Sequence, residues 1–164
     1  MTYWLERALF IPKPRAEVFA FFADAFNLER ITPAFLRFHI VTPGPIAMHA
    51  GTLIDYELRL YGVKFRWRTR IAAYEAPDFF VDEQLKGPYR SWVHRHSFEE
   101  APGGTLMRDR VEYALGFGPL GALAHAMLVR RSVERIFAYR NETIRGIFGA
   151  GPEGPLSAGA DSPA

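Results

Sequence analysis

A long helical segment near the C-terminal end, from about Pro119 to Phe148, most constrains what this chain can fold into. Proline is tolerated at a first helical position, and Gly149 is typical of a helix end. At about 100° per residue, one face of the segment forms a stripe. The stripe consists of Ala122, Ala126, Val129, Val133, Ile136, Phe137, Arg140, Ile144 and Ile147. The side chains in the first half of the stripe are small, and those in the second half are bulky. A sheet packed on this face would therefore lie close to the helix at one end and leave a space at the other. That gap would admit a small molecule.

The residues before this helix read as strands separated by short turns. Residues 63–74 show the clearest alternation, because Phe65 and Trp67 share one face while Lys64 and Arg66 share the other. Strands joined by short turns pair antiparallel, and this alternation indicates one covered and one wet face. The predicted strands are residues 3–11, 36–41, 53–61, 63–74, 79–85, 89–99 and 105–115.

Two short helices are expected after the first strand. Val18, Phe21 and Phe22 recur at helical spacing within residues 14–25, and a second helical turn follows within residues 27–33. The elements together predict an α+β fold in which an antiparallel sheet of about seven strands is covered by the long C-terminal helix.

Length and composition favour one domain. With 164 residues, of which 49% are hydrophobic, the chain can bury a sizeable core, and we assign the domain to residues 1–149. Residues 150–164 are rich in Gly, Pro, Ala and Ser and offer little apolar surface, so we expect a disordered tail.

Charge and targeting signals favour a cytoplasmic protein. The formal net charge is only +2, which predicts weak long-range attraction to nucleic acids or anionic lipids. Glu6 and Arg7 interrupt the apolar run that a signal peptide requires, and Gly and Pro residues break the uncharged stretch 114–129 before it reaches membrane-spanning length. There is no cysteine, so disulfides and thiolate chemistry are excluded.

The order of these elements resembles the START-like, helix-grip superfamily (SRPBCC), and the resemblance covers about residues 2–148. It is carried by Pro12 to Phe22, Asn27 to Pro33, Gly87 to Phe98 and Asp109 to Tyr113. The resemblance implies a curved sheet that grips the last helix around a cavity. The functions it implies range from lipid and quinone binding to polyketide cyclase or dehydratase activity.

A polar cluster is predicted on the covered face of the sheet. Residues two apart on a strand share a face, so His94 and His96 point the same way as Trp92 and Phe98. The next strand brings Asp109 and Tyr113 to this side. The alternation within residues 79–85 does not show which side chains face the covered side of the sheet. We place Asp82 and Gln84 on that side because they would then find polar partners.

Three interpretations of the cluster remain open. The histidines and acids can satisfy one another's hydrogen bonds at a polar end of the pocket. Alternatively, His94 or His96, oriented by Asp109, can act as a general acid or base. A metal site is a third option, since His-x-His on a strand is a common ligand geometry. The sequence shows no further ligand with the expected spacing, and we predict neither metal nor cofactor.

Two further patterns are set aside. Gly116-Phe-Gly118-Pro-Leu-Gly121 matches G-x-G-x-x-G, but no parallel strand follows the helix, so a nucleotide site is not expected. The rows of basic residues around Arg66, Arg68 and Arg70 lack interleaved aromatics. They are predicted to form a solvated face that does not bind nucleic acid.

The sequence therefore predicts a protein that binds a hydrophobic or aromatic small molecule between the sheet and the last helix. The expected ligand-binding residues are Phe38, Tyr56, Trp67, Asp82, Gln84, Trp92, His94, His96, Phe98, Asp109, Val111, Tyr113, Ala122 and Ala126. One alternative is a cyclase or dehydratase using His94, His96 and Asp109 as catalytic groups. Another is a quinone or lipid carrier that touches a membrane through Leu120, Leu123, Met127 and Leu128. Membrane contact is possible but not expected, and the pattern specifies no oligomeric state.

Overall fold

The computed structural model describes residues 1–116, 128–149 and 157–161. The strands are β1 (Thr2–Ile11), β2 (His39–Ile40), β3 (Leu53–Leu60), β4 (Val63–Glu75), β5 (Phe79–Lys86), β6 (Ser91–Ala101), β7 (Gly104–Ala114) and β8 (Ser157–Asp161). The helices are α1 (Arg15–Ala23), α2 (Asn27–Arg30), the short 3-10 helix η1 (Ala34–Leu36) and α4 (Arg130–Phe148). The two short helices after the first strand are thus confirmed.

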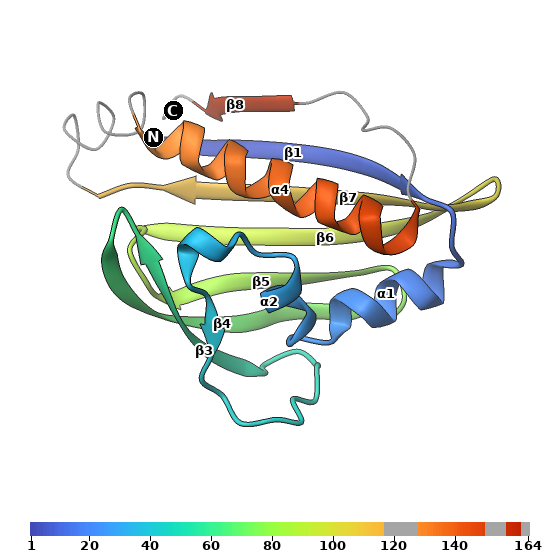
Figure 1. The fold of residues 1–164 in the computed structure, drawn as a ribbon, viewed down its shortest axis with the longest axis horizontal. Coiled ribbons are helices and arrows are strands. Elements are labelled where there is room, and N and C mark those ends of the chain that lie inside the picture. Colours follow the sequence, from blue (N-terminus) through green and yellow to red (C-terminus); the bar gives the residue numbers. More distant parts are fainter. Residues whose placement is uncertain (117–127, 150–156, 162–164) are drawn as a thin grey trace.

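All strands belong to one curved antiparallel sheet with the order β2-β3-β4-β5-β6-β7-β1-β8. Strands β3 to β7 follow one another through short turns, and β1 joins the sheet beside β7. Helix α4 crosses the sheet over β1 and β7, while α1 packs against β6 and β7 near one end of the sheet (Figure 1). The predicted α+β helix-grip architecture is confirmed.

The C-terminal segment differs from the prediction in one stretch. We expected residues 150–164 to be disordered, but Ser157–Asp161 forms β8 and pairs antiparallel with β1 from Thr2 to Glu6. The free edge of β1 offers unpaired backbone N–H and C=O groups, and antiparallel pairing with a short strand satisfies them. Amino-acid composition did not indicate this strand, because β8 is held by backbone hydrogen bonds to β1.

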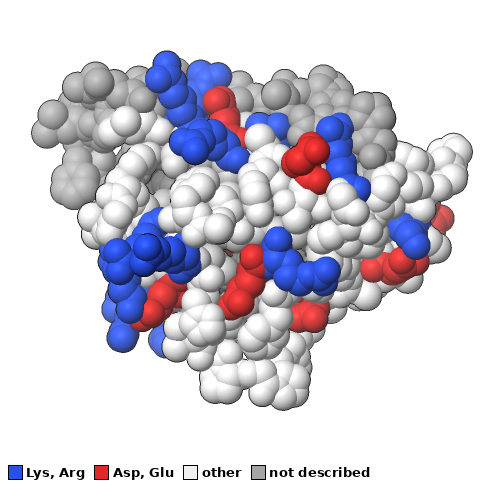
Figure 2. Space-filling view, in the orientation of Figure 1, with Lys and Arg blue, Asp and Glu red and all other residues white. Residues whose placement is uncertain are grey.

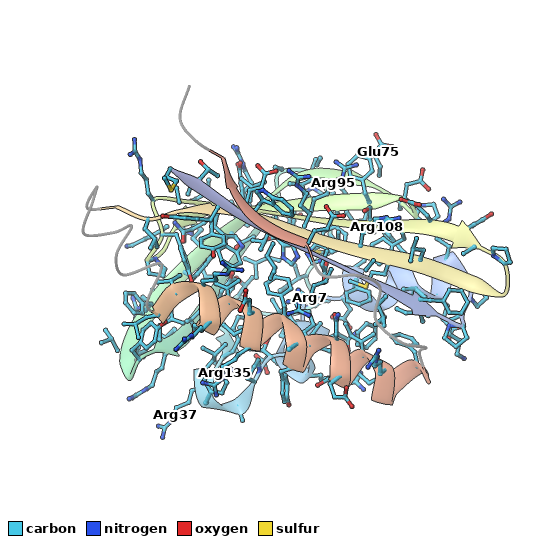
Figure 3. The ribbon with its side chains drawn as sticks, turned by 90° about the horizontal axis from the view of Figure 1, so that it is seen from above. Arg7, Arg37, Glu75, Arg95, Arg108 and Arg135 are labelled. Atoms are coloured by element: carbon cyan, nitrogen blue, oxygen red, sulfur yellow. The ribbon has the colours of Figure 1, made fainter. Side chains whose placement is uncertain are left out.

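Helix α4 buries the face that its sequence predicted. Val133, Phe137 and Ile144 are buried, and the same face also buries Arg140 and Asn141. From β1, Arg7 reaches up to this helix, where its Nη2 donates to the backbone oxygen of Glu134 at 3.3 Å (Figure 3). The expected beginning of the helix, including Ala122 and Ala126, lies outside the described residues.

Charged side chains lie on the surface in pairs. On the outer face of the sheet Arg68 Nε lies 2.7 Å from Asp55 Oδ1, and Lys64 Nζ lies 2.7 Å from Glu57 Oε2. On the helix-bearing face both signs are interspersed around a broad uncharged area (Figure 2). The rows of basic residues predicted from sequence thus lie on a solvated face that carries its own counter-charges.

Phe98 tests the packing of the sheet against α1. Its side chain is 2% exposed, and its ring lies 5.4 Å from Phe19 and 5.5 Å from Phe22, centroid to centroid. Phe98→Ala should lower the free energy of unfolding by about 3–5 kcal/mol in urea denaturation, because it leaves a cavity in tight packing. Phe35→Ala, at an exposed ring, should change it by less than about 1 kcal/mol. Equal losses for the two variants would contradict this account of the core.

Candidate functional site

A cavity of about 160 Å³ lies between the sheet and the helices. Its walls come from strands β3 to β6, from α1, α2 and η1, and from α4. Seven of the predicted ligand-binding residues line it, namely Phe38, Tyr56, Trp67, Asp82, Trp92, His94 and His96. The cavity lies between the sheet and α4, where Val133, Ile136, Phe137 and Arg140 line it. The gap predicted beside Ala122 and Ala126 falls outside the described residues and stays a prediction.

One wall of the cavity is a continuous series of aromatic rings. Phe38 lies 4.7 Å from Tyr56, and Tyr56 stacks on Trp67 with 5.7 Å between ring centroids. Trp67 in turn meets Trp92 edge to face at 5.5 Å. These rings come from a loop and from strands β3, β4 and β6, so they support one another across the sheet. They form an apolar, rigid surface suited to a flat or apolar ligand.

The opposite part of the site is a polar cluster created by strand register. His94 is paired with Asp82 on β5, and His96 is paired with Asp109 on β7. Directly paired residues share a face, so two imidazoles are held between two carboxylates. The two imidazole rings lie 3.8 Å apart, centroid to centroid. The predicted inward phase of Asp82 is thereby observed.

Each imidazole contacts both carboxylates. His96 lies 3.0 Å from Asp82 Oδ2 through Nε2 and 2.7 Å from Asp109 Oδ1 through Nδ1. His94 lies 3.2 Å from Asp109 Oδ1 through Nε2 and 3.7 Å from Asp82 Oδ2 through Nδ1. Asp109 is buried beneath the rings, whereas the Asp82 side chain is 17% exposed and lines the cavity. The cluster thus joins a buried acid to a cavity-facing acid.

The electrostatic environment separates the two histidines. Burial alone would lower the pKa of His96, but the Asp109 and Asp82 carboxylates outweigh it and raise that pKa. Burial and the neighbouring His96 lower the pKa of His94, despite the same two acids. Burial opposes ionisation of Asp109, yet the two imidazoles hold its pKa well below the usual range. These directions favour a protonated His96 and a neutral His94 between two ionised carboxylates.

Arg140 completes the charge balance from α4. Its Nη1 lies 3.7 Å from Asp109 Oδ2, and its side chain is buried while lining the cavity. The two carboxylates are then flanked by this guanidinium, by the His96 imidazole and by Arg7, which is the buried register partner of Asp109 on β1. These cationic groups compensate the carboxylates among the aromatic rings, since an unbalanced buried charge is costly.

Asp82, His94 and His96 also have metal-ligand character, because one ligand atom from each lies within 4.8 Å of the others. A divalent cation bound there would require both imidazoles to be neutral, whereas the Asp109 and Asp82 carboxylates raise the pKa of His96 and favour its protonated form.

The structure does not bring every predicted residue to the cavity. Phe98, Val111 and Tyr113 belong to the packed core instead. Gln84 closes the turn between β5 and β6, where its Nε2 donates to the Tyr89 backbone oxygen at 2.7 Å. The Gln84 side chain lies close to the turn, so its amide group bonds to the backbone of Tyr89 and does not join the histidine–aspartate cluster. Ala122 and Ala126 lie outside the described residues.

Arg140 was not among the predicted site residues. It interrupts the apolar stripe of α4 at a position that helical spacing buries, and that interruption was the available signal. A charged residue on a core-facing stripe requires a partner, and here the partner is Asp109 from a distant strand. Thr69, which binds the Tyr56 hydroxyl at 3.1 Å, was missed for the same reason: its partner lies on another strand.

The sheet, the gripping helix and the cavity define a helix-grip protein. Residues 11–137 match the family described as "Polyketide cyclase / dehydrase and lipid transport", and the chain belongs to that family. The resemblance to the START-like superfamily is thus confirmed. No curated protein matches the sequence. Among the described residues, no helix is long and apolar enough to cross a membrane.

Solved structures with the same fold include Ms6760 from Mycobacterium smegmatis, at 18% identity and a TM-score of 0.63, covering 89% of this chain and 90% of that one. Ara h 8.0201 shares 17% identity with a TM-score of 0.62 over 90% of this chain and 98% of that chain. The di-domain ARO/CYC StfQ from the steffimycin biosynthetic pathway shares 14% identity with a TM-score of 0.67, over 91% of this chain and 51% of that chain. At these identities the likeness shows the fold alone.

The opposite pKa directions of the two histidines predict a maximum of stability near pH 6.5. His96 has a raised pKa, so its contribution is complete below the unfolded value and is lost as pH rises through the folded value. His94 has a lowered pKa, so stability falls as pH drops below the unfolded value of about 6.5. Urea unfolding from pH 5 to 9 should therefore show a loss of stability on each side of this maximum.

An exposed histidine provides the control for this pH profile. His49→Gln should leave it unchanged, because this residue lies at the surface, away from the cluster. His96→Asn should remove the decline on the alkaline side. A stability that is flat from pH 5.5 to 9 in the wild type would show that the imidazoles do not carry the assigned protons.

Proposed function

We propose that this domain binds one compact hydrophobic or aromatic small molecule in the cavity between the sheet and α4. The observation that carries the proposal is the cavity itself, with an aromatic wall on one side and a buried polar cluster on the other. A volume of about 160 Å³ is close to the size that accommodates a benzene molecule. The ligand portion held there is therefore a single ring or a group of similar size.

The polar cluster at the cavity wall also supports a ligand-binding role. Buried ion pairs can often be replaced by apolar residues of similar volume at no cost to stability. Here four ionisable groups occupy the cavity wall, and Phe80 stacks on His96 at 4.3 Å to hold its ring in place. Polar groups placed this rigidly against an apolar cavity orient the polar end of a ligand.

A cavity-filling substitution tests this proposal. Ala25 is buried and lines the cavity, so Ala25→Leu should fill part of it and weaken binding of indole or toluene at least tenfold. Amide shifts in a ¹H–¹⁵N NMR titration would report binding to the wild type at residues of β4 to β6. The matched control is Ala138→Leu on the exposed side of α4. If benzene, toluene, phenol and indole all fail to give saturable shifts with the wild type, the proposal is wrong.

Acid–base catalysis on a carbonyl compound is the second candidate function, favoured by the placement of Asp82. Its carboxylate faces the cavity and is joined through His96 to the buried Asp109. The ionised Asp82 carboxylate can take a proton from a bound molecule. The His96 side chain, held between two carboxylates, can stabilise the resulting redistribution of charge. Such a device suits the proton transfers of a cyclase or dehydratase.

The second candidate function can be tested with acetophenone. Removal of a methyl proton from this ketone is the simplest proton transfer that acid–base catalysis would require, and it is seen as exchange with solvent deuterium. The protein should accelerate the exchange, and Asp82→Asn should reduce the acceleration by about 100-fold or more, as followed by ¹H NMR. Asp55→Asn, on the outer face of the sheet, should have no effect. Equal rates with and without protein would argue against acid–base catalysis while leaving ligand binding untouched.

The membrane-carrier hypothesis gains no comparable support. Leu120, Leu123 and Met127 lie outside the described residues, and Leu128 is an exposed single side chain. Cytoplasmic localisation stays a prediction from the sequence.

A further inference from the structure

Arg140 has unused hydrogen-bonding capacity at the cavity wall. Its side chain is only 7% exposed, and its Nη1 has no hydrogen-bond partner in the described part of the chain. Its contacts are the ion pair with Asp109 at 3.7 Å and the ring of Phe137, 5.3 Å from the guanidinium carbon. A guanidinium carries five N–H donors, and leaving buried donors unpaired is costly.

A second donor at the same cavity is in a similar state. Trp67 lines the cavity and is 6% exposed, and its indole Nε1 has no hydrogen-bond partner in the described part of the chain. Indole N–H donates only, so it too calls for an acceptor. The cavity thus combines an apolar wall with unpaired donors on two different elements, β4 and α4. Its natural complement is a molecule with an oxygen acceptor.

The charges around the cavity decide which kind of oxygen fits. Arg140 is already balanced by Asp109, and the cavity-facing carboxylate of Asp82 would repel a ligand anion. A neutral carbonyl oxygen accepts a hydrogen bond from the guanidinium without this repulsion, because it carries no formal charge.

Building on the proposed function, we propose that Arg140 determines ligand specificity by donating a hydrogen bond to the carbonyl oxygen of a compact, uncharged aromatic ligand. The aromatic portion lies against Tyr56, Trp67 and Trp92, and the carbonyl group points toward α4. Arg140 is therefore a ligand-binding residue as well as the counter-charge of Asp109.

Three probes of similar size separate this proposal from simple hydrophobic binding. Acetophenone presents a carbonyl oxygen, α-methylstyrene replaces that oxygen with a CH₂ group, and benzoate presents an anion. NMR titration should show that the wild type binds acetophenone at least tenfold more tightly than α-methylstyrene, because a hydrogen bond to a charged donor is made only by the ketone. Benzoate should bind more weakly than acetophenone.

Variants at Arg140 assign the preference to its side chain. Arg140→Met should bind acetophenone and α-methylstyrene about equally. Arg140→Lys keeps the positive charge opposite Asp109 but loses the planar fork, so it should reduce the preference several-fold in a folded protein. Arg131→Met and Arg131→Lys, at an exposed position of α4, should retain the wild-type preference.

The outcomes distinguish this inference from the proposed function. If α-methylstyrene binds as tightly as acetophenone, or if benzoate binds most tightly, the role assigned to Arg140 is wrong while the cavity remains a binding site. An acetophenone preference that survives in Arg140→Lys and Arg140→Met alike would also overturn it. If none of the three probes binds the wild type, the proposed function fails, and this inference fails with it.

Discussion

The site depends on the compensation of charge in a buried cluster. Asp82 and Asp109 bring two negative charges to the covered face of the sheet, and Arg140, one imidazolium and the buried Arg7 on β1 offset them. The sheet register makes this possible, because each histidine is paired with an acid on a neighbouring strand. Without that balance, ionised groups at this depth would either lose their charge or open the structure to water.

The same arrangement gives the cavity its two-sided character. The curved sheet carries aromatic rings on β3, β4 and β6, while α4 closes the site with Phe137 and Arg140. Burial raises the pKa of the Tyr56 hydroxyl, with the Asp82 charge adding to the effect, so this residue stays neutral and bonded to Thr69. Binding and acid–base chemistry therefore draw on the same groups, and a ligand carbonyl beside Asp82 would serve both.

Much of the fold could be predicted because alternation and helical spacing report burial directly. The alternating pattern of β6 placed His94 and His96 on the covered face, and the stripe of α4 placed Val133, Phe137 and Ile144 against the sheet. Features set by long-range partners escaped prediction. Strand β8 depends on the free backbone edge of β1, and Gln84 is held by a turn rather than by the cluster. Alternation alone also does not distinguish a cavity wall from packed core, as Phe98 shows.

The protonation states of the two buried histidines test the central claim most directly. Long-range ¹H–¹⁵N NMR of the imidazole nitrogens at pH 7 distinguishes a cationic ring, with both nitrogens protonated, from a neutral one. This account predicts that His96 is cationic and His94 neutral in the folded protein. Finding both rings neutral, or both cationic, would contradict the charge balance on which the site is built.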